Sequence, residues 1–313
     1  MRLVSFATRD LPKPHLGIVR DDEVVDVDLA GQALRLTAPD QMLDLIDNYE
    51  RYLPALQAIL QKAGQRRFTQ VRTFSDIGAA HLLSEVVLAA PIPRPRKNIF
   101  CLATNYQEHL QETANLRDHS GIMPEYPVFF TKAPTTVNSP YGTIVIDPAI
   151  STEIDWEVEL AVIIGKTGKN IRQEDAPSYV FGYTVLNDLS ARDIQTRHRQ
   201  FFKGKSLDGL CPMGPCIVTA DELPDPHNLG LRLRVNGITK QASNTSLMIF
   251  SINTAIAELS MGMTLEPGDI IATGTPGGVG FSRMPPEFLI PGDVVESEVD
   301  GIGMLRNAVR YAR

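Results

Sequence analysis

Acidic and apolar residues alternate strictly along residues 153–160. In order, the positions are Glu153, Ile154, Asp155, Trp156, Glu157, Val158, Glu159 and Leu160. A period of two over this length predicts a β-strand with one buried face and one acidic face. The apolar run 161–164 that follows takes the end of this strand into a core. We expect the rest of the fold to be arranged around this strand.

Shorter apolar or alternating runs predict further strands. They lie at residues 3–6, 17–19, 24–27, 97–103, 128–131, 143–146, 181–186 and 231–235. Asn236-Gly237 follows the last of these, and this dipeptide between two strands predicts a tight hairpin. The pattern therefore predicts an α+β protein that is mainly β.

Apolar residues at helical spacing predict only a few helices. The segments are 40–63, 105–115, 174–180 and 251–261. Within the first segment, Pro54 is expected to begin a second helix and Gly64 to stop it. Ser251 is expected to cap the last helix. Residues 113–126 offer few apolar anchors and are predicted to form a mobile loop.

A proline-rich stretch divides the chain. Pro91, Pro93 and Pro95 stiffen the backbone between two apolar segments, which is typical of a domain boundary. We predict a small N-terminal α/β accessory domain over residues 1–92. A larger domain over residues 93–313 would then contain the candidate chemistry.

Composition narrows the class of protein. The chain has 313 residues, a net charge of −7 and an isoelectric point near 5.4, which argue against a nucleic-acid surface. No apolar run approaches the roughly 18 residues of a membrane span, and residues 1–6 lack the apolar core of a signal peptide. We therefore expect a cytoplasmic protein without nucleic-acid or membrane partners. Its odd number of cysteines, Cys101, Cys211 and Cys216, predicts free thiols.

Candidate chemistry begins with two carboxylates near the apolar end of the first strand. Glu157 and Glu159 are two residues apart, so their Cβ atoms should lie about 6.5–7 Å apart on one face. Both carboxylates could then reach one cation, and oxygen ligands favour Mg²⁺, Mn²⁺ or Ca²⁺ over zinc. The structural alternative is a solvated edge strand whose acidic face has no ligand.

Asp188 follows the strand predicted at 181–186 and would supply a third carboxylate if the two strands are neighbours. Asp188, Arg192 and Gln195 also lie four and then three residues apart, which places them on one face of a helical turn. The structural alternative for Arg192 is an ion pair with Asp188 or Asp193. His109, in the polar helix after residue 105, has the alternative of an ordinary exposed histidine.

Two nucleotide-binding motifs and one nucleophile motif are excluded by the residues present. Gly204-Lys205-Ser206 resembles the end of a phosphate-binding loop, but Arg199 stands where that loop requires glycine. The glycine-rich stretch 274–280 lacks the GxGxxG spacing. The chain also contains no GxSxG sequence.

Five motifs, in the same order along the chain, resemble the fumarylacetoacetate hydrolase family over about residues 95–311. They are Asn105-Tyr106-x-x-His109, Asp155-Trp156-Glu157-Val158-Glu159-Leu160, Gly182-Tyr183-Thr184-Val185-x-Asn187-Asp188-x-Ser190-Ala191-Arg192-Asp193, Gly204-Lys205-Ser206 through Pro212-x-Gly214-Pro215, and Gly274-Thr275-Pro276-x-Gly278-Val279-Gly280. The first 90 residues resemble, more weakly, the accessory domain of many bacterial members. The chain departs from the family at Ala103-Thr104, where a glycine more often precedes Asn-Tyr, and this departure concerns the lid hinge and the pocket shape.

The resemblance implies a fold and a set of site residues. The fold would be a β-roll, present as a homodimer or larger homo-oligomer. Mg²⁺ or Mn²⁺, with Ca²⁺ as a substitute, would bind to Glu157, Glu159 and Asp188. The remaining assignments are a water-activating dyad of His109 and Glu112, an active-site lysine at Lys205, and substrate-binding residues at Arg192, Gln195 and Thr275.

The implied activity is hydrolysis of a carbon–carbon bond in an acylpyruvate-like 2,4-dioxo acid, through a metal-bound enolate. The same site could instead isomerise a 2-hydroxymuconate-type acid or decarboxylate an oxaloacetate-type acid in aromatic catabolism, because all three reactions stabilise an enolate. A third alternative is a non-catalytic module in which a cation only ties strands together. That alternative would leave His109, Glu112 and Lys205 without a role.

Overall fold

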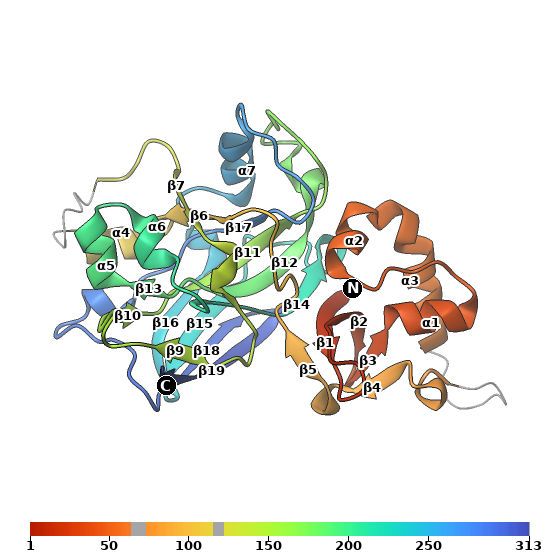
Figure 1. The fold of residues 1–313 in the computed structure, drawn as a ribbon. Helices are drawn as coiled ribbons and strands as arrows, with labels where there is room; N and C mark the ends of the chain where they lie inside the picture. The colour runs from red at the N-terminus through yellow and green to blue at the C-terminus, as the bar shows by residue number, and fades with distance from the viewer. Residues whose placement is uncertain (64–72, 115–121, 313) are drawn as a thin grey trace.

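The computed structural model describes residues 1–63, 73–114 and 122–312. Its N-terminal segment is a small antiparallel sheet covered by helices (Figure 1). The strands are β1 (Arg2–Ala7), β2 (His15–Arg20), β3 (Glu23–Asp26), β4 (Ala80–Leu82) and β5 (Val87–Ala89). The helices are α1 (Val27–Leu34), α2 (Met42–Asp47) and α3 (Tyr49–Ala63).

The remainder of the chain builds two sheets that pack face to face. The larger one continues from β1 in the order β14 (Cys211–Thr219), β12 (Val180–Asn187), β11 (Val158–Ile164), β17 (Ile270–Ala272), β6 (Ile99–Ala103) and β7 (Val128–Lys132). The smaller one has the order β16 (Ile238–Asn244), β15 (Gly230–Val235), β18 (Val294–Val299), β19 (Gly303–Tyr311) and β9 (Ile144–Ile146). This mainly β architecture confirms the predicted fold class.

Short elements complete the end of the molecule opposite the N-terminal segment (Figure 1). They are the strand pair β10 (Ile154–Asp155) and β13 (Ser190–Ala191) and the helices α4 (Gln107–Thr113), α5 (Arg192–His198) and α6 (Phe201–Lys205). The apolar face of the amphipathic helix α7 (Ile252–Ser260) packs into the cluster between the two sheets. The Ser251 hydroxyl caps this helix by accepting from the Thr254 N–H at 3.1 Å, as predicted.

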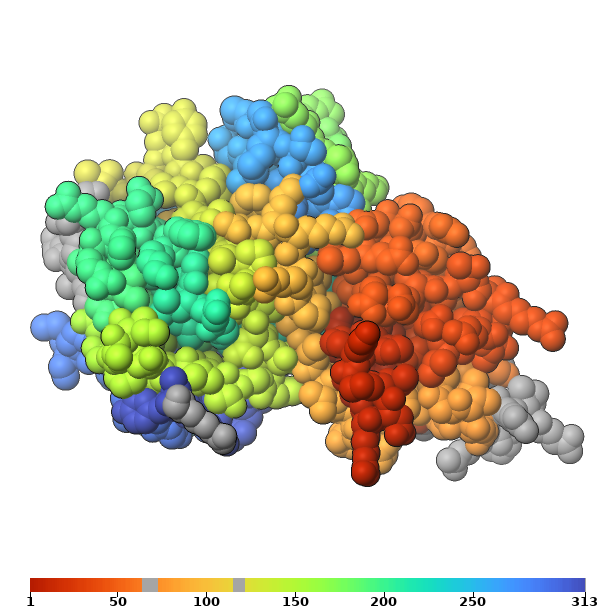
Figure 2. Space-filling model, viewed as in Figure 1, coloured from red at the N-terminus to blue at the C-terminus, as the bar shows by residue number. Residues whose placement is uncertain are grey.

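The N-terminal segment shares a sheet with the rest of the chain. In β1, Arg2 and Leu3 pair antiparallel with Val218 and Ile217 of β14. The segment also packs against the larger part over a continuous surface (Figure 2). The proline-rich stretch forms the connection from β5 to β6, and the boundary at residue 92 stays a prediction.

The organising strand differs from its prediction in two ways. It is interrupted, because β10 ends at Asp155 and β11 begins at Val158. Every residue of β11 is buried, so the prediction of a single buried face is wrong. Ala161 and Ile163 pack into the apolar cluster under the N-terminal helices, whereas Leu160 and Val162 pack into the cluster between the two sheets.

Most other local predictions agree with the structure. The hairpin at Asn236-Gly237 joins β15 to β16, with φ of 53° and 77° at the two residues. Pro54 lies inside α3 instead of beginning a helix, because the Asn48 carbonyl already accepts from the N–H groups of residues 51 and 52. The helix expected at 174–180 is a short 3₁₀ turn (Ala176–Tyr179). Gly64 and much of the loop at 113–126 lie outside the described residues.

In the part of the chain that the structure describes, no helix is both long and apolar enough to cross a membrane.

Gly182 tests the close packing of β12 on β14. A Cβ atom at this position would lie 2.8 Å from Ile217 Cγ2 and closer still to the Val218 carbonyl oxygen. We predict that Gly182→Ala lowers the free energy of unfolding by about 1–3 kcal/mol in urea titrations, because the β14 backbone has to move. Gly230→Ala in β15 is the control, since its Cβ would meet only the half-exposed Asp300 side chain. Equal stability of the two variants would contradict this packing.

Candidate active site

Three carboxylates meet at the point where β11 begins and β12 ends. Glu157 lies in the break before β11, Glu159 lies in β11, and Asp188 directly follows β12. Because β11 and β12 are antiparallel neighbours, the Asp188 N–H donates to the Glu157 carbonyl at 2.8 Å. The three residues are at most 4% exposed, and one carboxylate oxygen from each lies within 4.8 Å of the others. The structure thus brings the predicted metal ligands together, and the alternative of a solvated edge strand is wrong.

Buried cations surround these carboxylates. The Lys205 ammonium lies 2.5 Å from Glu157 Oε2 and 2.8 Å from Asp188 Oδ2. Lys132, fully buried at the end of β7, lies 2.7 Å from Asp188 Oδ1 and donates to the Leu189 carbonyl at 3.0 Å. Sequence reasoning missed Lys132, although a lysine that ends an apolar strand is an indication of a buried partner.

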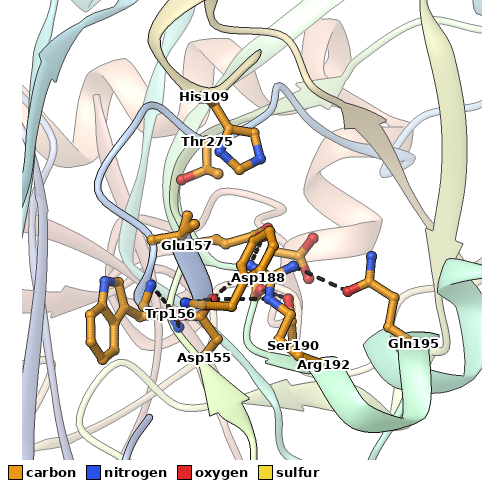
Figure 3. Close-up of polar contacts among 12 residues, drawn as sticks. His109, Asp155, Trp156, Glu157, Asp188, Ser190, Arg192, Gln195 and Thr275 are labelled. Carbon is orange, nitrogen blue, oxygen red and sulfur yellow. Dashed lines mark hydrogen bonds and ion pairs between the residues drawn. The ribbon is translucent and has the colours of Figure 1, made fainter. Parts of the chain in front are cut away.

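Arg192 joins the carboxylates to their surroundings (Figure 3). Its guanidinium donates to Glu157 Oε1 at 2.5 Å and to Asp155 Oδ2 at 2.9 Å, so the structural alternative of an ion pair with Asp188 or Asp193 is wrong. Arg192 Nη1 also donates to Gln195 Oε1 at 3.1 Å. Asp155 is fully buried and accepts from the N–H of Phe281 at 3.1 Å, a positioning role that the sequence analysis did not find.

The pKa values of the two glutamates move in opposite directions. Burial alone would raise the pKa of Glu157, but the charges of Lys205 and Arg192 outweigh it and lower this pKa to about 2. Burial raises the pKa of Glu159 well above its usual value, and the neighbouring Asp188 and Glu157 charges raise it further. Glu159 is therefore the carboxylate of the cluster with the least cationic compensation.

A divalent cation fits this cluster. Glu159 Oε2 accepts from the Gly274 N–H at 2.7 Å, and no lysine or arginine of the described residues forms an ion pair with Glu159. An all-oxygen set of three carboxylates is the donor type that Mg²⁺ and Mn²⁺ bind. The ion would be held by Glu157, Glu159 and Asp188.

The predicted dyad lies beside the carboxylates. His109 Nδ1 lies 2.8 Å from Glu112 Oε1, both on α4, and His109 is 8% exposed, which contradicts the alternative of an ordinary exposed histidine. Glu112 Oε2 accepts from the Gly278 N–H at 2.7 Å and from Ser282 Oγ at 2.9 Å. Because the carboxylate accepts at Nδ1, we assign the proton to Nδ1, which leaves Nε2 able to accept a proton.

The predicted substrate-binding residues differ in how many of their polar groups already form hydrogen bonds within the protein. The Thr275 hydroxyl donates to the Val158 carbonyl at 3.0 Å and accepts from Gln241 Nε2 at 2.8 Å, so it is already engaged by the protein. Gln195 uses its carbonyl oxygen to accept from Arg192, and its amide NH₂ remains available on the cavity side. Gln241 also accepts a hydrogen bond from the Val158 N–H at 3.0 Å through its Oε1. This residue was not identified from the sequence.

Seven of the residues described above, His109, Glu157, Glu159, Arg192, Gln195, Lys205 and Thr275, line one cavity of about 470 Å³. Its lining comprises Leu102, Ala103, Thr104, His109, Phe130, Glu157, Glu159, Arg192, Gln195, Thr196, Arg199, Phe201, Lys205, Thr275 and Phe281. Thr104 has a φ of 50°, an unfavourable conformation for a β-branched residue. The position at which the sequence departs from the family pattern is thus part of the cavity wall.

The family model described as "Fumarylacetoacetate (FAA) hydrolase C-terminal" matches residues 98–310, more than half of the chain. The chain belongs to the fumarylacetoacetate hydrolase family. This confirms the resemblance inferred from the five motifs, and it places the carboxylate cluster and the dyad inside the family domain.

Relatives of this family member are similar over nearly their whole length. Oxaloacetate tautomerase YisK of Bacillus subtilis is 42% identical over 311 residues, which cover 98% of this chain and 100% of YisK. The solved fumarylacetoacetate hydrolase of Exiguobacterium antarcticum is 35% identical, with a TM-score of 0.79 and full coverage of both chains. Maleylpyruvate hydrolase of Sphingobium sp. SYK-6, solved with manganese(II) and pyruvate, is 32% identical, with a TM-score of 0.76 and full coverage of both chains. The family is thus one of enzymes, and these relatives act on oxo acids.

Two carboxylate variants should separate metal binding from fold stability. Glu159→Gln keeps an acceptor for the Gly274 N–H and removes a charge that its neighbours repel. We therefore expect this variant to be at least as stable as the metal-free wild type and to lose Mn²⁺ binding. Asp188→Asn leaves Lys132 and Lys205 without their full counter-charge, and should lower the free energy of unfolding by about 3–5 kcal/mol.

Urea unfolding in the presence of a chelator measures stability, and electron paramagnetic resonance of free Mn²⁺ measures binding. Unchanged Mn²⁺ affinity in folded Glu159→Gln would refute the proposed ligand set. If the two variants are equally stable, the charge balance described for the carboxylate cluster is refuted.

Proposed function

We propose that this protein is a divalent-metal-dependent tautomerase that interconverts the keto and enol forms of a short 2-oxo acid of the oxaloacetate type. The observation that carries the proposal is the position of His109: a buried base oriented by Glu112 lines the same cavity as Glu157 and Glu159, two of the three clustered carboxylates. The similarity to YisK over nearly the whole chain supports this choice of substrate.

A bound Mg²⁺ or Mn²⁺ would act as a Lewis acid that polarises the 2-oxo group and so acidifies the neighbouring C–H. The protein's residues would handle the proton and the developing charge. His109 Nε2 removes the proton from the carbon beside the carbonyl, and the electron pair of that C–H bond forms the enolate. The Glu112 carboxylate stabilises the imidazolium that results.

The enolate oxygen is expected to form beside cationic and polar donors. The pKa of Lys205 is raised, because its attraction to Asp188 and Glu157 outweighs the opposing effect of burial, so the ammonium stays charged at neutral pH. Lys205 and the free NH₂ of Gln195 would stabilise the oxyanion as it forms. Return of the proton from His109 to oxygen then completes the tautomerisation.

Hydrolysis of an acylpyruvate is the second candidate. The same dyad could remove a proton from water instead of from carbon, and Thr104 and Phe130 also line the cavity that would hold the larger substrate. The maleylpyruvate hydrolase with manganese(II) and pyruvate supports this candidate. In that reaction, water adds to the distal carbonyl and the bond to the pyruvate half breaks. A homodimer or larger homo-oligomer stays a prediction.

The direct test of the tautomerase follows the enol of oxaloacetate by its ultraviolet absorbance after enol-rich oxaloacetate is diluted into buffer with Mg²⁺. We expect the purified protein to accelerate the approach to the keto–enol equilibrium, and Glu159→Gln to lose this effect. Pyruvate release from acetylpyruvate in the same buffer measures the hydrolase. If the protein accelerates neither the tautomerisation of oxaloacetate nor the release of pyruvate, the proposal is refuted.

Loss of the base should distinguish reactions that move a proton from one that does not. We predict that His109→Ala slows tautomerisation, or hydrolysis, about 10²–10⁴-fold, the usual contribution of a positioned general base. Decarboxylation of oxaloacetate breaks a C–C bond without a base and should slow much less. Glu112→Gln should also slow tautomerisation or hydrolysis more than decarboxylation, but each rate should fall less than in His109→Ala. Equal losses in all assays would mean that His109 only orients the substrate.

A further inference from the structure

One face of α5 lines the cavity from its floor to its mouth. Arg192, Gln195 and Thr196 lie at helical spacing on one face of α5 and line the cavity, and Arg199, the left-handed residue that ends this helix (φ 56°), lines it as well. Arg192 lies at the carboxylate floor, and Arg199 follows the last residue of the helix. The seven-residue separation corresponds to about two helical turns, or roughly 10 Å along the axis.

The cations of this cavity differ in what they already bind. Arg192 is held between Asp155 and Glu157, and Lys205 between Glu157 and Asp188. Arg199 is exposed at the cavity mouth, and its backbone N–H donates to the Thr196 carbonyl at 3.3 Å. Within residues 1–63, 73–114 and 122–312, its guanidinium has neither a hydrogen bond nor an ion pair. Arg199 is therefore a cavity-lining cation whose charge is not balanced by any of the described residues.

We propose that Arg199 binds the second carboxylate of a dicarboxylic 2-oxo acid and so makes the site selective for diacids over monoacids. This inference rests on the proposed function, in which the 2-oxo acid end lies at Glu157, Glu159 and Asp188. In a four-carbon substrate the second carboxylate is attached to the carbon that loses its proton, so it points away from that end. The planar guanidinium matches a carboxylate with two parallel hydrogen bonds.

The placement also keeps Arg199 out of the chemistry. A cation at the mouth, one or two helical turns from the floor, attracts the distal anion without adding charge beside the three carboxylates. It would therefore affect which acid binds, and it would not alter proton transfer at His109. A solvated surface arginine, by contrast, would distinguish no acids from one another.

Two unreactive hydroxy acids isolate this contact from turnover. (S)-Malate and (S)-lactate share a 2-hydroxy acid group, and only malate has a second carboxylate. We would measure the binding of each by isothermal titration calorimetry to the Mg²⁺-loaded protein. We expect the wild type to bind malate about 10–100-fold more tightly than lactate, the contribution of a charge-assisted pair. Arg199→Gln should abolish this preference by weakening malate alone, and Arg199→Lys should restore part of it.

Arg197→Gln is the matched control, because Arg197 is an exposed arginine of the same helix that does not line the cavity. It should leave the malate-to-lactate ratio unchanged. An unchanged ratio in Arg199→Gln, an equal loss for both acids, or no malate preference in the wild type would each overturn the inference.

The diacid site and the proposed reaction can fail independently of each other. If no oxo acid is turned over but the malate preference disappears in Arg199→Gln, the diacid site stands and the proposed reaction fails. If turnover of oxaloacetate persists with its KM unchanged in Arg199→Gln, the reaction stands and the diacid site fails.

Discussion

Four buried carboxylates lie together in this protein, and the arrangement of the site depends on how their charges are balanced. Asp155, Glu157, Glu159 and Asp188 are each at most 4% exposed. Such groups are stable in a protein interior only when they are paired. Lys132, Lys205 and Arg192 supply the pairing for three of them, and each cation contacts at least one carboxylate directly. Glu159 is the exception, so the protein is built with a place for one more positive charge.

One turn connects this charge network to the base. The segment 278–282 donates to Glu112 from the Gly278 N–H and from Ser282, and it donates to Asp155 from the N–H of Gly280. Phe281 in the same turn lies under the Arg192 guanidinium, 4.2 Å from it to the ring centroid. The orientation of His109 and that of the carboxylate floor are therefore set by the same few residues. This arrangement gives the site preorganisation, which is the main source of electrostatic stabilisation in enzymes.

The sequence predicted the general fold and the principal site residues, because both depend on local patterns. Alternation identified the strand with Glu157 and Glu159, the end of the next predicted strand identified Asp188, and the family motifs identified His109 with Glu112. The sequence did not predict Lys132 or the partners of Arg192, because these contacts join residues that are far apart in the chain. It also assigned a single buried face to β11, since periodicity describes one strand and not the layers that cover it. Asp155 and Glu157 on the acidic face are buried together with the cations that pair with them, which no local pattern shows.

The pairing of β1 with β14 has a consequence for the edge of the larger sheet. The exposed edge of a β-sheet is a template on which another chain can add a strand. Here the edge at Val218 and Ile217 is covered by Arg2 and Leu3. A version of the protein that began after the proline-rich connection would present that edge to solvent, next to the apolar surface that the N-terminal helices now cover. Such a fragment would be prone to edge-to-edge aggregation even with every residue of the proposed site present. The N-terminal segment therefore protects this sheet edge from pairing with a strand of another chain.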